Sequence, residues 1–360
     1  MEKKIKVLQV VPSLSQANGV VACILNYCEH IDKNKYQVDF AVLSDWNKSR
    51  FEEIKNSGYI IHELYRCKNI FKYIFEVKKF FRENAYDIIH CNVANTGVIF
   101  LYYAKKYNVR LRILHSHATQ TSDKLLNKLR NDGILLITKK FANCYVACSN
   151  LAGKAMFKNN NFIVLNNAID CEKYRFDLGI RNNIRQKYNL KSSEFIIGTI
   201  GRLCEQKNQI FLIKLLSRLD NKFKLIIVGN GRLEKKLKKE ASDLGVSDRV
   251  IFTGSIKNTN EYYSAFDLFV LPSLYEGLPV VGVEAQANGV PCVFSETITN
   301  ELQINTNVLF EKLDLNIWEH IIKNCPLRNE NCYKFLESNY NIKNEAHSLE
   351  NIYDKQINIQ

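Results

Sequence analysis

The sequence lacks several features that would mark particular classes of protein. No apolar run reaches the roughly 18 residues that a membrane-spanning helix needs. The short apolar run near the N-terminus is typical of a first strand and not of a signal peptide. There is no Walker A motif, no D-x-D, no C-x-x-C pair, no internal repeat and no low-complexity segment. We therefore expect a folded, cytoplasmic protein without a P-loop.

Composition agrees with an ordinary globular protein of more than one domain. Of the 360 residues, 46% are hydrophobic and 24% are charged, and the length favours two domains. The 11 cysteines are odd in number and scattered, and several stand in strand-like runs. This pattern indicates reduced, buried thiols and not a disulfide or zinc framework.

The positive charge is concentrated in the first half of the chain. Residues 1–170 contain 25 Lys and Arg against 14 Asp and Glu, whereas residues 171–360 contain 25 against 23. The first half therefore carries most of the net charge of +13. Such a surface favours an anionic partner, namely nucleic acid, an anionic membrane or a phosphorylated acceptor, although a lysine-rich soluble surface would look the same.

Strands and helices alternate along both halves, which predicts parallel, doubly wound α/β sheets. Two such units imply two Rossmann-like domains with a boundary near residues 166–193. In these sheets ligands bind at the carboxyl ends of the strands, so the loops that follow strands are the candidate sites. The expected strands are Ile5–Val11, Gln37–Leu43, Asp87–Cys91, Leu111–His115, Cys144–Ala147, Phe162–Leu165, Phe195–Gly201, Phe223–Val228, Arg249–Phe252, Asp267–Leu271 and Pro291–Phe294, and the expected helices include Val20–His30 and Ile70–Glu83.

The most specific motif is a pair of carboxylates around a Gly-Leu-Pro turn. Glu276 and Glu284 are separated by seven residues, and Glu276 follows a predicted buried strand. Pro279 is expected in the first turn of the next helix, where its missing N–H costs nothing. Glu276 and Gly277 would then lie at a helix N-terminus, which suits an anionic, polyhydroxylated ligand such as a nucleotide sugar.

Two cations follow the first strand of the second half. Arg202 offers a bidentate fork to phosphate oxygens, and Lys207 adds a second charge near the start of the next helix. Together they suit a diphosphate, although two surface cations would give the same pattern.

Two histidines, His115 and His117, close the predicted strand that begins at Leu111. Residues at i and i+2 on a strand point the same way, so both rings are expected on one face. No third ligand stands nearby in the sequence, so no metal site is expected. A hydrogen bond to a sugar hydroxyl or to a developing charge is favoured, with a histidine satisfied at the sheet end as the alternative.

Glycines mark three further strand-to-helix loops. Gly19 opens a helix after the first strand, and Gly229 and Gly231 form a G-x-G turn. Each allows close approach of a ligand to the backbone, but any tight turn would select the same residues. Gly254 and Ser255 follow another strand and are candidates for contact with a base.

Taken in order, Arg202, Lys207, the G-x-G turn, Gly254 and the E-x7-E motif resemble a GT-B-fold glycosyltransferase of family four. The resemblance extends over nearly the whole chain and includes the segments 148–157, 165–170 and 272–299. The block from Pro272 to Pro291 looks most like the branch that builds bacterial capsules and exopolysaccharides. One departure is Asn18-Gly19, where members of the family often have Gly-Gly.

The resemblance implies a role for each candidate residue. Arg202 and Lys207 would neutralise the leaving diphosphate, Glu276 with Gly277 and Leu278 would hold the transferred sugar, and Glu284 would hold the ribose. His117, with His115 beside it, would face the donor sugar, and Gly19 would approach the diphosphate. Gly229, Gly231 and Ser255 complete the donor-binding set, and no metal or other cofactor is expected.

The implied architecture is GT-B, with two Rossmann-like domains facing across a cleft. Residues 1–168 would form the acceptor-side domain and residues 169–340 the nucleotide-sugar domain. Residues 341–360 would form a helix that packs back on the first.

The implied reaction moves a hexosyl group from a nucleoside-diphosphate sugar, expected to be a UDP-sugar, to a glycan or lipid-linked glycan with retention, in capsule, exopolysaccharide or cell-surface polysaccharide biosynthesis. The alternatives are a GT-B-fold nucleotide-sugar 2-epimerase that hydrolyses its donor, and a non-catalytic nucleotide-sugar-binding subunit.

A polyprenyl-diphosphate-linked acceptor would place the protein at the inner face of the plasma membrane. The segment Asp123–Lys140 mixes basic and apolar residues at roughly helical spacing, which suits peripheral contact with an anionic membrane. The segment Ile70–Glu83 is similar, but it precedes a strand and is expected to pack on the core. The partner of the basic half is then a membrane and a glycan acceptor, and not nucleic acid.

Overall fold

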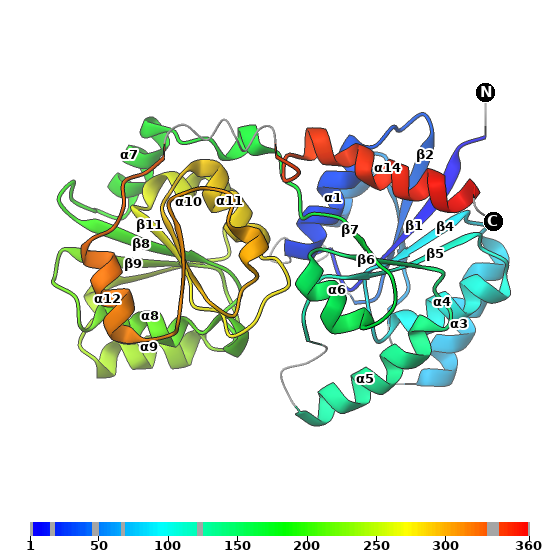
Figure 1. Cartoon of the computed structure of the whole chain (residues 1–360), viewed down its shortest axis with the longest axis horizontal. Coiled ribbons are helices and arrows are strands. Elements are labelled where there is room, and N and C mark those ends of the chain that lie inside the picture. Colours follow the sequence, from blue (N-terminus) through cyan, green and yellow to red (C-terminus); the bar gives the residue numbers. More distant parts are fainter. Residues whose placement is uncertain are drawn as a thin grey trace. The chain divides into compact units, whose positions relative to one another are not determined.

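The structure is a computed structural model that describes residues 3–14, 19–44, 50–65, 69–120, 125–329 and 338–358. The chain divides into two compact units (Figure 1). Unit 1 combines Met1–Asn166 with Ile342–Gln360, and unit 2 is Asn167–Asn341. The second unit is thus inserted into the first.

Unit 1 is built on a seven-stranded sheet in the order β3-β2-β1-β4-β5-β6-β7, and every neighbouring pair is parallel. The strand order reverses between β1 and β4, which makes this the switch point where ligands bind in such sheets. The strands are β1 (Ile5–Val11), β2 (Tyr36–Val42), β3 (Ile60–Glu63), β4 (Ile88–Cys91), β5 (Leu111–Ser116), β6 (Cys144–Ala147) and β7 (Ile163–Val164).

Helices lie on both sides of this sheet, because parallel strands need crossover connections. Figure 1 shows α1 and α14 on one side and α3, α4 and α5 on the other. The helix α3 begins at an N-cap, Asn69, whose side chain accepts from the N–H groups of Phe71 and Lys72. The helices are α1 (Gly19–His30), α2 (Phe51–Asn56), α3 (Ile70–Glu83), α4 (Gly97–Lys106), α5 (Leu125–Lys139), α6 (Asn150–Phe157) and α14 (Ile342–Asn358).

The C-terminal helix α14 is an integral part of unit 1. It packs on α1, and its residues Ile342, Leu349 and Tyr353 are buried. At its exposed edge Asp354 accepts a hydrogen bond from the hydroxyl of Tyr36 at 2.5 Å. Although 175 residues of unit 2 intervene in the sequence, α14 completes the first hydrophobic core.

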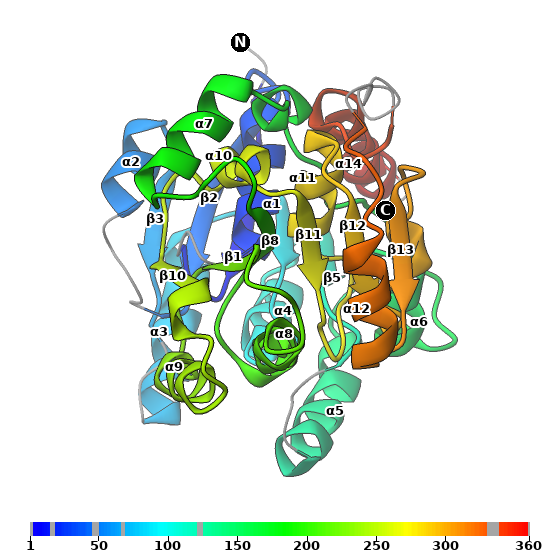
Figure 2. The ribbon, with the colours of Figure 1, turned by 90° about the vertical axis from the view of Figure 1, so that its left-hand side faces the viewer.

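Unit 2 is built on a six-stranded parallel sheet in the order β10-β9-β8-β11-β12-β13. Figure 2 shows β10, β8, β11, β12 and β13 in this order from left to right. The order reverses between β8 and β11, so the switch point lies between these two strands. The strands are β8 (Phe195–Ile200), β9 (Phe223–Val228), β10 (Val250–Gly254), β11 (Leu268–Leu271), β12 (Cys292–Ser295) and β13 (Val308–Glu311).

In unit 2, α10 and α11 cover one side of the sheet, and α8, α9 and α12 cover the other (Figure 1). The helices are α7 (Leu178–Lys187), α8 (Gln209–Leu216), α9 (Glu234–Asp243), α10 (Thr259–Ala265), α11 (Val280–Asn288) and α12 (Leu315–Lys323), with short 3-10 turns η2 (Cys171–Tyr174), η3 (Glu205–Lys207), η4 (Ser247–Arg249) and η5 (Asn300–Leu302).

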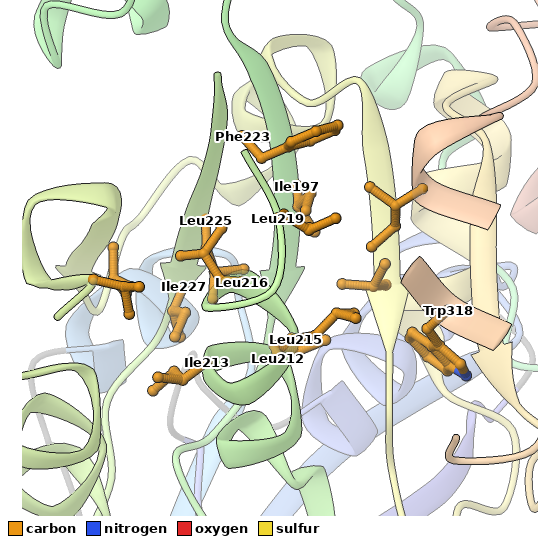
Figure 3. Packing of buried hydrophobic residues seen from close by; sticks show 14 of the residues in the cluster. Ile197, Leu212, Ile213, Leu215, Leu216, Leu219, Phe223, Leu225, Ile227 and Trp318 are labelled. Carbon is orange, nitrogen blue, oxygen red and sulfur yellow. The ribbon is translucent and has the colours of Figure 1, made fainter. Parts of the chain in front are cut away.

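A hydrophobic cluster fills the space beneath β8, β9 and β11 on the side of α8 (Figure 3). Leu212, Leu215 and Leu216 of α8 contribute to it, together with Leu225 and Ile227 of β9. Trp318 of α12 closes one end: its ring is fully buried, lies edge-on to Phe211 at 5.1 Å and donates from Nε1 to the carbonyl of Lys312 at 2.8 Å. The core therefore fixes α8, and with it the loop that precedes α8.

The predicted α/β fold and its strands are confirmed, with ends that differ by one or two residues. Two strands were missed, β3 and β13, which lie at the edges of their sheets. Both are only four residues long and only partly buried, so their apolar runs are short. The helix Ile70–Glu83 is confirmed, and it has an exposed apolar face in addition to the expected buried one: Phe71 and Phe75 are 81% and 63% exposed.

Replacement of Trp318 by Ala should lower the free energy of unfolding by about 3–5 kcal/mol, because it leaves a large cavity under α12. Ile317 is a matched control on the same helix, since 38% of its surface is exposed. Ile317→Ala should change the free energy of unfolding by less than about 1 kcal/mol. Urea unfolding followed by circular dichroism measures both, and equal effects would contradict the assigned core position.

Candidate active site

Two loops meet at the switch point of unit 2: residues 201–208 after β8, and residues 272–279 after β11. The N–H of Leu274 donates to the carbonyl of Gln206 at 2.8 Å, and the Gln206 side chain donates to the carbonyl of Tyr275 at 3.0 Å. Asn208 donates from its amide to the carbonyl of Pro272 at 3.2 Å. These bonds hold the two loops as one piece at the carboxyl ends of the central strands.

The two loops carry a buried ion pair. Lys207 Nζ lies 2.7 Å from Glu276 Oε1, and the two side chains are only 15% and 10% exposed. Burial of opposite charges is costly unless they are paired, and here each group lies against its opposite charge. An ammonium has three N–H donors, and Lys207 can therefore donate to an anionic ligand as well as to Glu276. The sequence predicted both residues as ligand-binding groups but not as partners.

Arg202 lies on the same loop but is exposed. Within the described ranges no ion pair or side-chain hydrogen bond is formed by its guanidinium. The neighbouring loop after β9 supplies another arginine, Arg232, which pairs with Glu205. The two cations that the sequence predicted as phosphate contacts thus lie on one loop, with Lys207 paired to Glu276 and Arg202 exposed.

The second carboxylate of the motif, Glu284, has a different environment. It lies within α11 and is buried, and its two oxygens accept from the hydroxyls of Tyr174 at 2.8 Å and Tyr263 at 2.6 Å. Burial raises the pKa of Glu284, and the two tyrosine hydrogen bonds oppose that rise. Each oxygen keeps a lone pair that can accept from a further hydroxyl. The two tyrosines were missed, because nothing in their local sequence points to Glu284.

The G-x-G turn after β9 has a packing reason for both glycines. A Cβ at Gly229 would lie 2.1 Å from the carbonyl oxygen of Gly201, and one at Gly231 would lie 2.4 Å from that of Leu203. The turn is therefore pressed against the loop that carries Arg202 and Lys207. These glycines support the site by close packing of two backbones. Ser255, beyond β10, is exposed.

The helix α11 begins one residue later than predicted. Pro279 is not in its first turn but is the N-cap residue, with an extended backbone at ψ 117°, and Val280 is the first helical residue. Proline has no side-chain acceptor, so the N-cap residue makes no side-chain hydrogen bond to the first turn of α11. Gly277 and Leu278 are buried in the preceding turn, and the carbonyl of Leu278 accepts from Asn167 at 2.6 Å.

The predicted histidines lie at the carboxyl end of β5, one strand away from the switch point of unit 1. His115 is near the end of β5 and His117 follows it, and their ring centroids are 3.9 Å apart. Both contact residues that the sequence reasoning missed: His90 Nε2 is 3.0 Å from His115 Nδ1, and His117 Nε2 is 2.9 Å from Asn92 Oδ1. Applying the strand-end rule to β4 would have found Asn92.

Burial keeps these histidines neutral. Desolvation lowers the pKa of His90 and of His117 to about 3, and it lowers that of His115 well below its ordinary value. They can therefore act as hydrogen-bonding groups at neutral pH but not as cations. No group of three or more His, Cys, Asp or Glu with the arrangement of a metal site occurs in the described part of the chain.

Gly19 is the first residue of α1 and is exposed. Asn18, the point of departure from the Gly-Gly pattern, lies outside the described residues. The candidate residues thus fall into two sets: Gly19, His115 and His117 in unit 1, and the remaining nine in unit 2. Within unit 2 the structure brings together Lys207 and Glu276, with the G-x-G turn beside their loop.

Two family models match most of the chain. The model described as Glycosyltransferase Family 4 matches residues 17–173, and the model described as Glycosyl transferases group 1 matches residues 180–308. The first lies in unit 1 but for its last few residues, and the second lies in unit 2.

Relatives with assigned names agree with these matches. EpsF of Bacillus subtilis, named as a glycosyltransferase, is 28% identical over 97% of this chain and 96% of its own length. The UDP-Gal:α-D-GlcNAc-diphosphoundecaprenol α-1,3-galactosyltransferase of Escherichia coli is 23% identical over the same shares. The capsular polysaccharide biosynthesis glycosyltransferase CapH of Staphylococcus aureus is 25% identical over 84% of this chain and 86% of its own.

Solved structures show the same fold. HepE of Anabaena in complex with UDP superposes with a TM-score of 0.79 at 17% identity, over 98% of this chain and all of that one. Sucrose-phosphate synthase of Thermosynechococcus elongatus gives 0.81 at 15% identity, over 99% and 100%. With two Rossmann-like units and both family models matched, the chain belongs to glycosyltransferase family 4 and has the GT-B fold.

Proposed function

We propose that the protein transfers a hexosyl group from a nucleoside-diphosphate sugar to a glycan or lipid-linked glycan, with retention of configuration, in the synthesis of a capsule, exopolysaccharide or other surface polysaccharide. The observation that carries the proposal is the Lys207–Glu276 ion pair at the switch point of unit 2. It places a cation and a carboxylate, suited to the phosphate and the hydroxyls of such a donor, on the two loops that precede α8 and α11.

The donor in this proposal is a UDP-sugar. The HepE structures contain UDP or UDP-glucose, and the name of the relative from Escherichia coli specifies UDP-galactose. Glu284 would accept the ribose hydroxyls with its remaining lone pairs, and Ser255 would approach the base. The buried turn at Gly277 and Leu278 would lie along the sugar.

The chemical step needs charge stabilisation at the leaving diphosphate. Arg202 and Lys207 would donate to its oxygens, and the N-terminus of α11 would add its partial positive charge. In this proposal the charge on the leaving diphosphate is stabilised without a metal ion. Glu276, released in part from Lys207, would accept from the hydroxyls of the sugar. Because retention proceeds on the front face of the donor in this proposal, no residue acts as a nucleophile.

Unit 1 would supply the remaining contacts and the acceptor. His115 and His117 would face the sugar, and the N–H groups at Gly19 would approach the diphosphate. A closing motion that joins the two units would then align donor and acceptor and exclude water.

A lipid-linked acceptor requires access to a membrane, and one side of unit 1 suits an anionic surface. There α3 exposes Phe71 and Phe75, while α5 exposes Leu126 and Leu129, at 82% and 62%. Both helices pack on α4 (Figure 1), and basic residues stand beside the apolar ones in the sequence. No helix in the described ranges is long and apolar enough to cross a membrane. We propose peripheral contact with the inner face of the plasma membrane.

The ion pair gives the first prediction of function. Lys207→Ala and Glu276→Ala should each lower the rate of sugar transfer by about 10²–10³-fold, because each removes a group that acts on the donor at the reacting centre. The control is Lys214→Ala on α8, which removes a lysine paired at 3.8 Å with Glu240 and half exposed. It should leave transfer unchanged. Near-normal turnover in either site variant, with an unchanged melting curve, would refute the assignment.

A panel of nucleotide sugars tests the donor. At a hundredfold excess over its Kd, the true donor should stabilise the protein by about 2.7 kcal/mol, seen as a rise in melting temperature. Arg202→Ala should weaken the shift from nucleoside diphosphates but not the shift from the free nucleoside. Release of free sugar and nucleotide without an acceptor would favour the 2-epimerase or hydrolase alternative, and binding without any turnover would favour a non-catalytic subunit.

Vesicle binding tests the membrane face. Phe71→Ser with Phe75→Ser should reduce binding to anionic vesicles by more than about tenfold, because two phenyl rings no longer leave water. Leu178→Ser on α7 is the control, since that side chain is 61% exposed on unit 2. Binding by the unaltered protein should also fall as salt is added. Equal binding to neutral vesicles would contradict the role of charge.

A further inference from the structure

A network of hydrogen-bonded polar side chains lies beneath the carboxyl edge of the sheet in unit 1. It consists of Gln9 on β1, His90 on β4, Asn92 after β4, His115 on β5 and His117 after β5, together with Tyr353 on α14. All are buried except His117, which is half-buried. Every member is held by another member, and Tyr353 comes from the opposite end of the chain.

Two branches leave the hydroxyl of Tyr353. In the first, Tyr353 Oη is 2.9 Å from His90 Nδ1, and His90 Nε2 is 3.0 Å from His115 Nδ1. In the second, Gln9 Nε2 is 3.1 Å from Tyr353 Oη, Asn92 Nδ2 is 2.9 Å from Gln9 Oε1, and His117 Nε2 is 2.9 Å from Asn92 Oδ1. Both branches end at a predicted site histidine.

The direction of every hydrogen bond in the network follows from two backbone carbonyls. Asn92 Nδ2 lies 3.4 Å from the carbonyl of Val10 and 3.3 Å from that of His90. Carbonyls only accept, so the amide nitrogen of Asn92 must face them and its oxygen must face His117. His117 therefore donates from Nε2, and its Nδ1 carries a lone pair.

The orientation of the Asn92 amide also determines the directions of the hydrogen bonds in the first branch. Asn92 also donates to Gln9 Oε1, which leaves Gln9 Nε2 to donate to Tyr353 Oη. With that oxygen accepting from Gln9, the phenolic hydrogen of Tyr353 goes to its other contact, His90 Nδ1. Neutral His90 then carries its hydrogen on Nε2 and donates to His115 Nδ1. His115 in turn carries its hydrogen on Nε2.

Two ring nitrogens remain at the ends of the network. His115 Nε2 and His117 Nδ1 are buried, and neither has a hydrogen-bond partner in the part of the chain that the structure describes. One is an N–H donor and the other is an acceptor, on rings that lie 3.9 Å apart. A hydroxyl group both accepts and donates one hydrogen bond, so the pair matches a hydroxyl of a ligand.

We propose that Tyr353 is a positioning residue, which fixes the tautomers of His90 and His115 so that unit 1 presents a donor at His115 Nε2 beside an acceptor at His117 Nδ1. The identification of the ligand hydroxyl as that of a sugar rests on the proposed function. The tautomers do not, because they follow from the contacts within unit 1.

Removal of the Tyr353 hydroxyl should allow His90 and His115 to adopt either tautomer. In Tyr353→Phe, one tautomer leaves an N–H without an acceptor at His115 Nε2, and the reversed tautomer leaves one at His90 Nδ1. The two forms have the same number of unsatisfied donors, so both should be populated. In the unaltered protein the reversed form would direct two N–H donors, from Gln9 and His90, at the phenolic oxygen and leave the fully buried phenolic hydrogen without an acceptor. The first form satisfies both contacts of Tyr353 and has its one unsatisfied donor at the end of the network, so the first form is expected alone.

Nitrogen-15 NMR of the full chain, labelled at its seven histidines, measures the tautomers directly. The unaltered protein should show His90, His115 and His117 each as one neutral form protonated at Nε2. Tyr353→Phe should show two forms at His90 and His115, and one at His117, whose partner Asn92 is held by the backbone. An Nδ1-protonated form of any of the three histidines in the unaltered protein would overturn the proposal. This part of the test uses no variant.

Tyr36→Phe is the matched control. Tyr36 lies edge-on to Tyr353, with 5.6 Å between ring centroids. Its hydroxyl donates to Asp354, which lies on α14 beside Tyr353, and to none of the histidines. It should leave all three tautomers unchanged while removing a comparable hydrogen bond from α14. If it alters the spectrum as Tyr353→Phe does, or if Tyr353→Phe keeps a single form, Tyr353 does not act as a positioning residue.

A kinetic measurement connects the tautomers to transfer. Tyr353→Phe should lower kcat/KM for the nucleotide sugar about twofold or more, since roughly half of the molecules present the wrong tautomer. Its Kd for the free nucleoside diphosphate, a ligand of unit 2, should not change. Altered tautomers with unaltered kinetics would show that the histidines do not face the sugar, and would contradict the proposed function but not the positioning role.

Discussion

In both sheets every pair of neighbouring strands is parallel, and the arrangement of functional groups depends on this constraint. Parallel strands end at the same edge, so each strand delivers the residue that follows it to one line along the molecule. Where the strand order reverses, the crossover helices leave in opposite directions and open a space at that edge. In unit 1 this point lies between β1 and β4, and in unit 2 between β8 and β11. Asn92 lies at the first and the Lys207–Glu276 pair at the second.

The two carboxylates of the E-x7-E motif show how one local pattern yields two chemical states. Glu276 is held beside an ammonium, whereas Glu284 is buried among neutral hydroxyl donors. The first is paired with an opposite charge, whereas burial raises the pKa of the second and its tyrosine hydrogen bonds oppose that rise. Two nearby acids could suggest a general acid and base. Their partners instead suit them to accept hydrogen bonds from a ligand.

The sequence was sufficient for the fold and for the positions of the loops, because apolar runs and glycine turns are local signals. Most strands were placed within two residues, and only the short edge strands β3 and β13 were missed. The sequence did not predict which side chains the site residues contact. The contact of Lys207 with Glu276 depends on β8 lying next to β11, although β9 and β10 intervene along the chain. The hydroxyls of Tyr174 and Tyr263 reach Glu284 from two separate elements, and Tyr353 reaches His90 from the last helix. Such contacts follow from strand order and packing, which no local pattern encodes.

The insertion of unit 2 within unit 1 has a consequence for synthesis. The core of unit 1 lacks Ile342, Leu349 and Tyr353 until α14 has been made. Those residues follow all of unit 2 in the sequence, so unit 2, which is contiguous, can fold before they emerge from the ribosome. The core formed by the first 166 residues therefore stays incomplete until α14 packs against it. A nascent chain truncated before α14 would contain a complete unit 2 and an incomplete unit 1, and would be a substrate for chaperones and proteases.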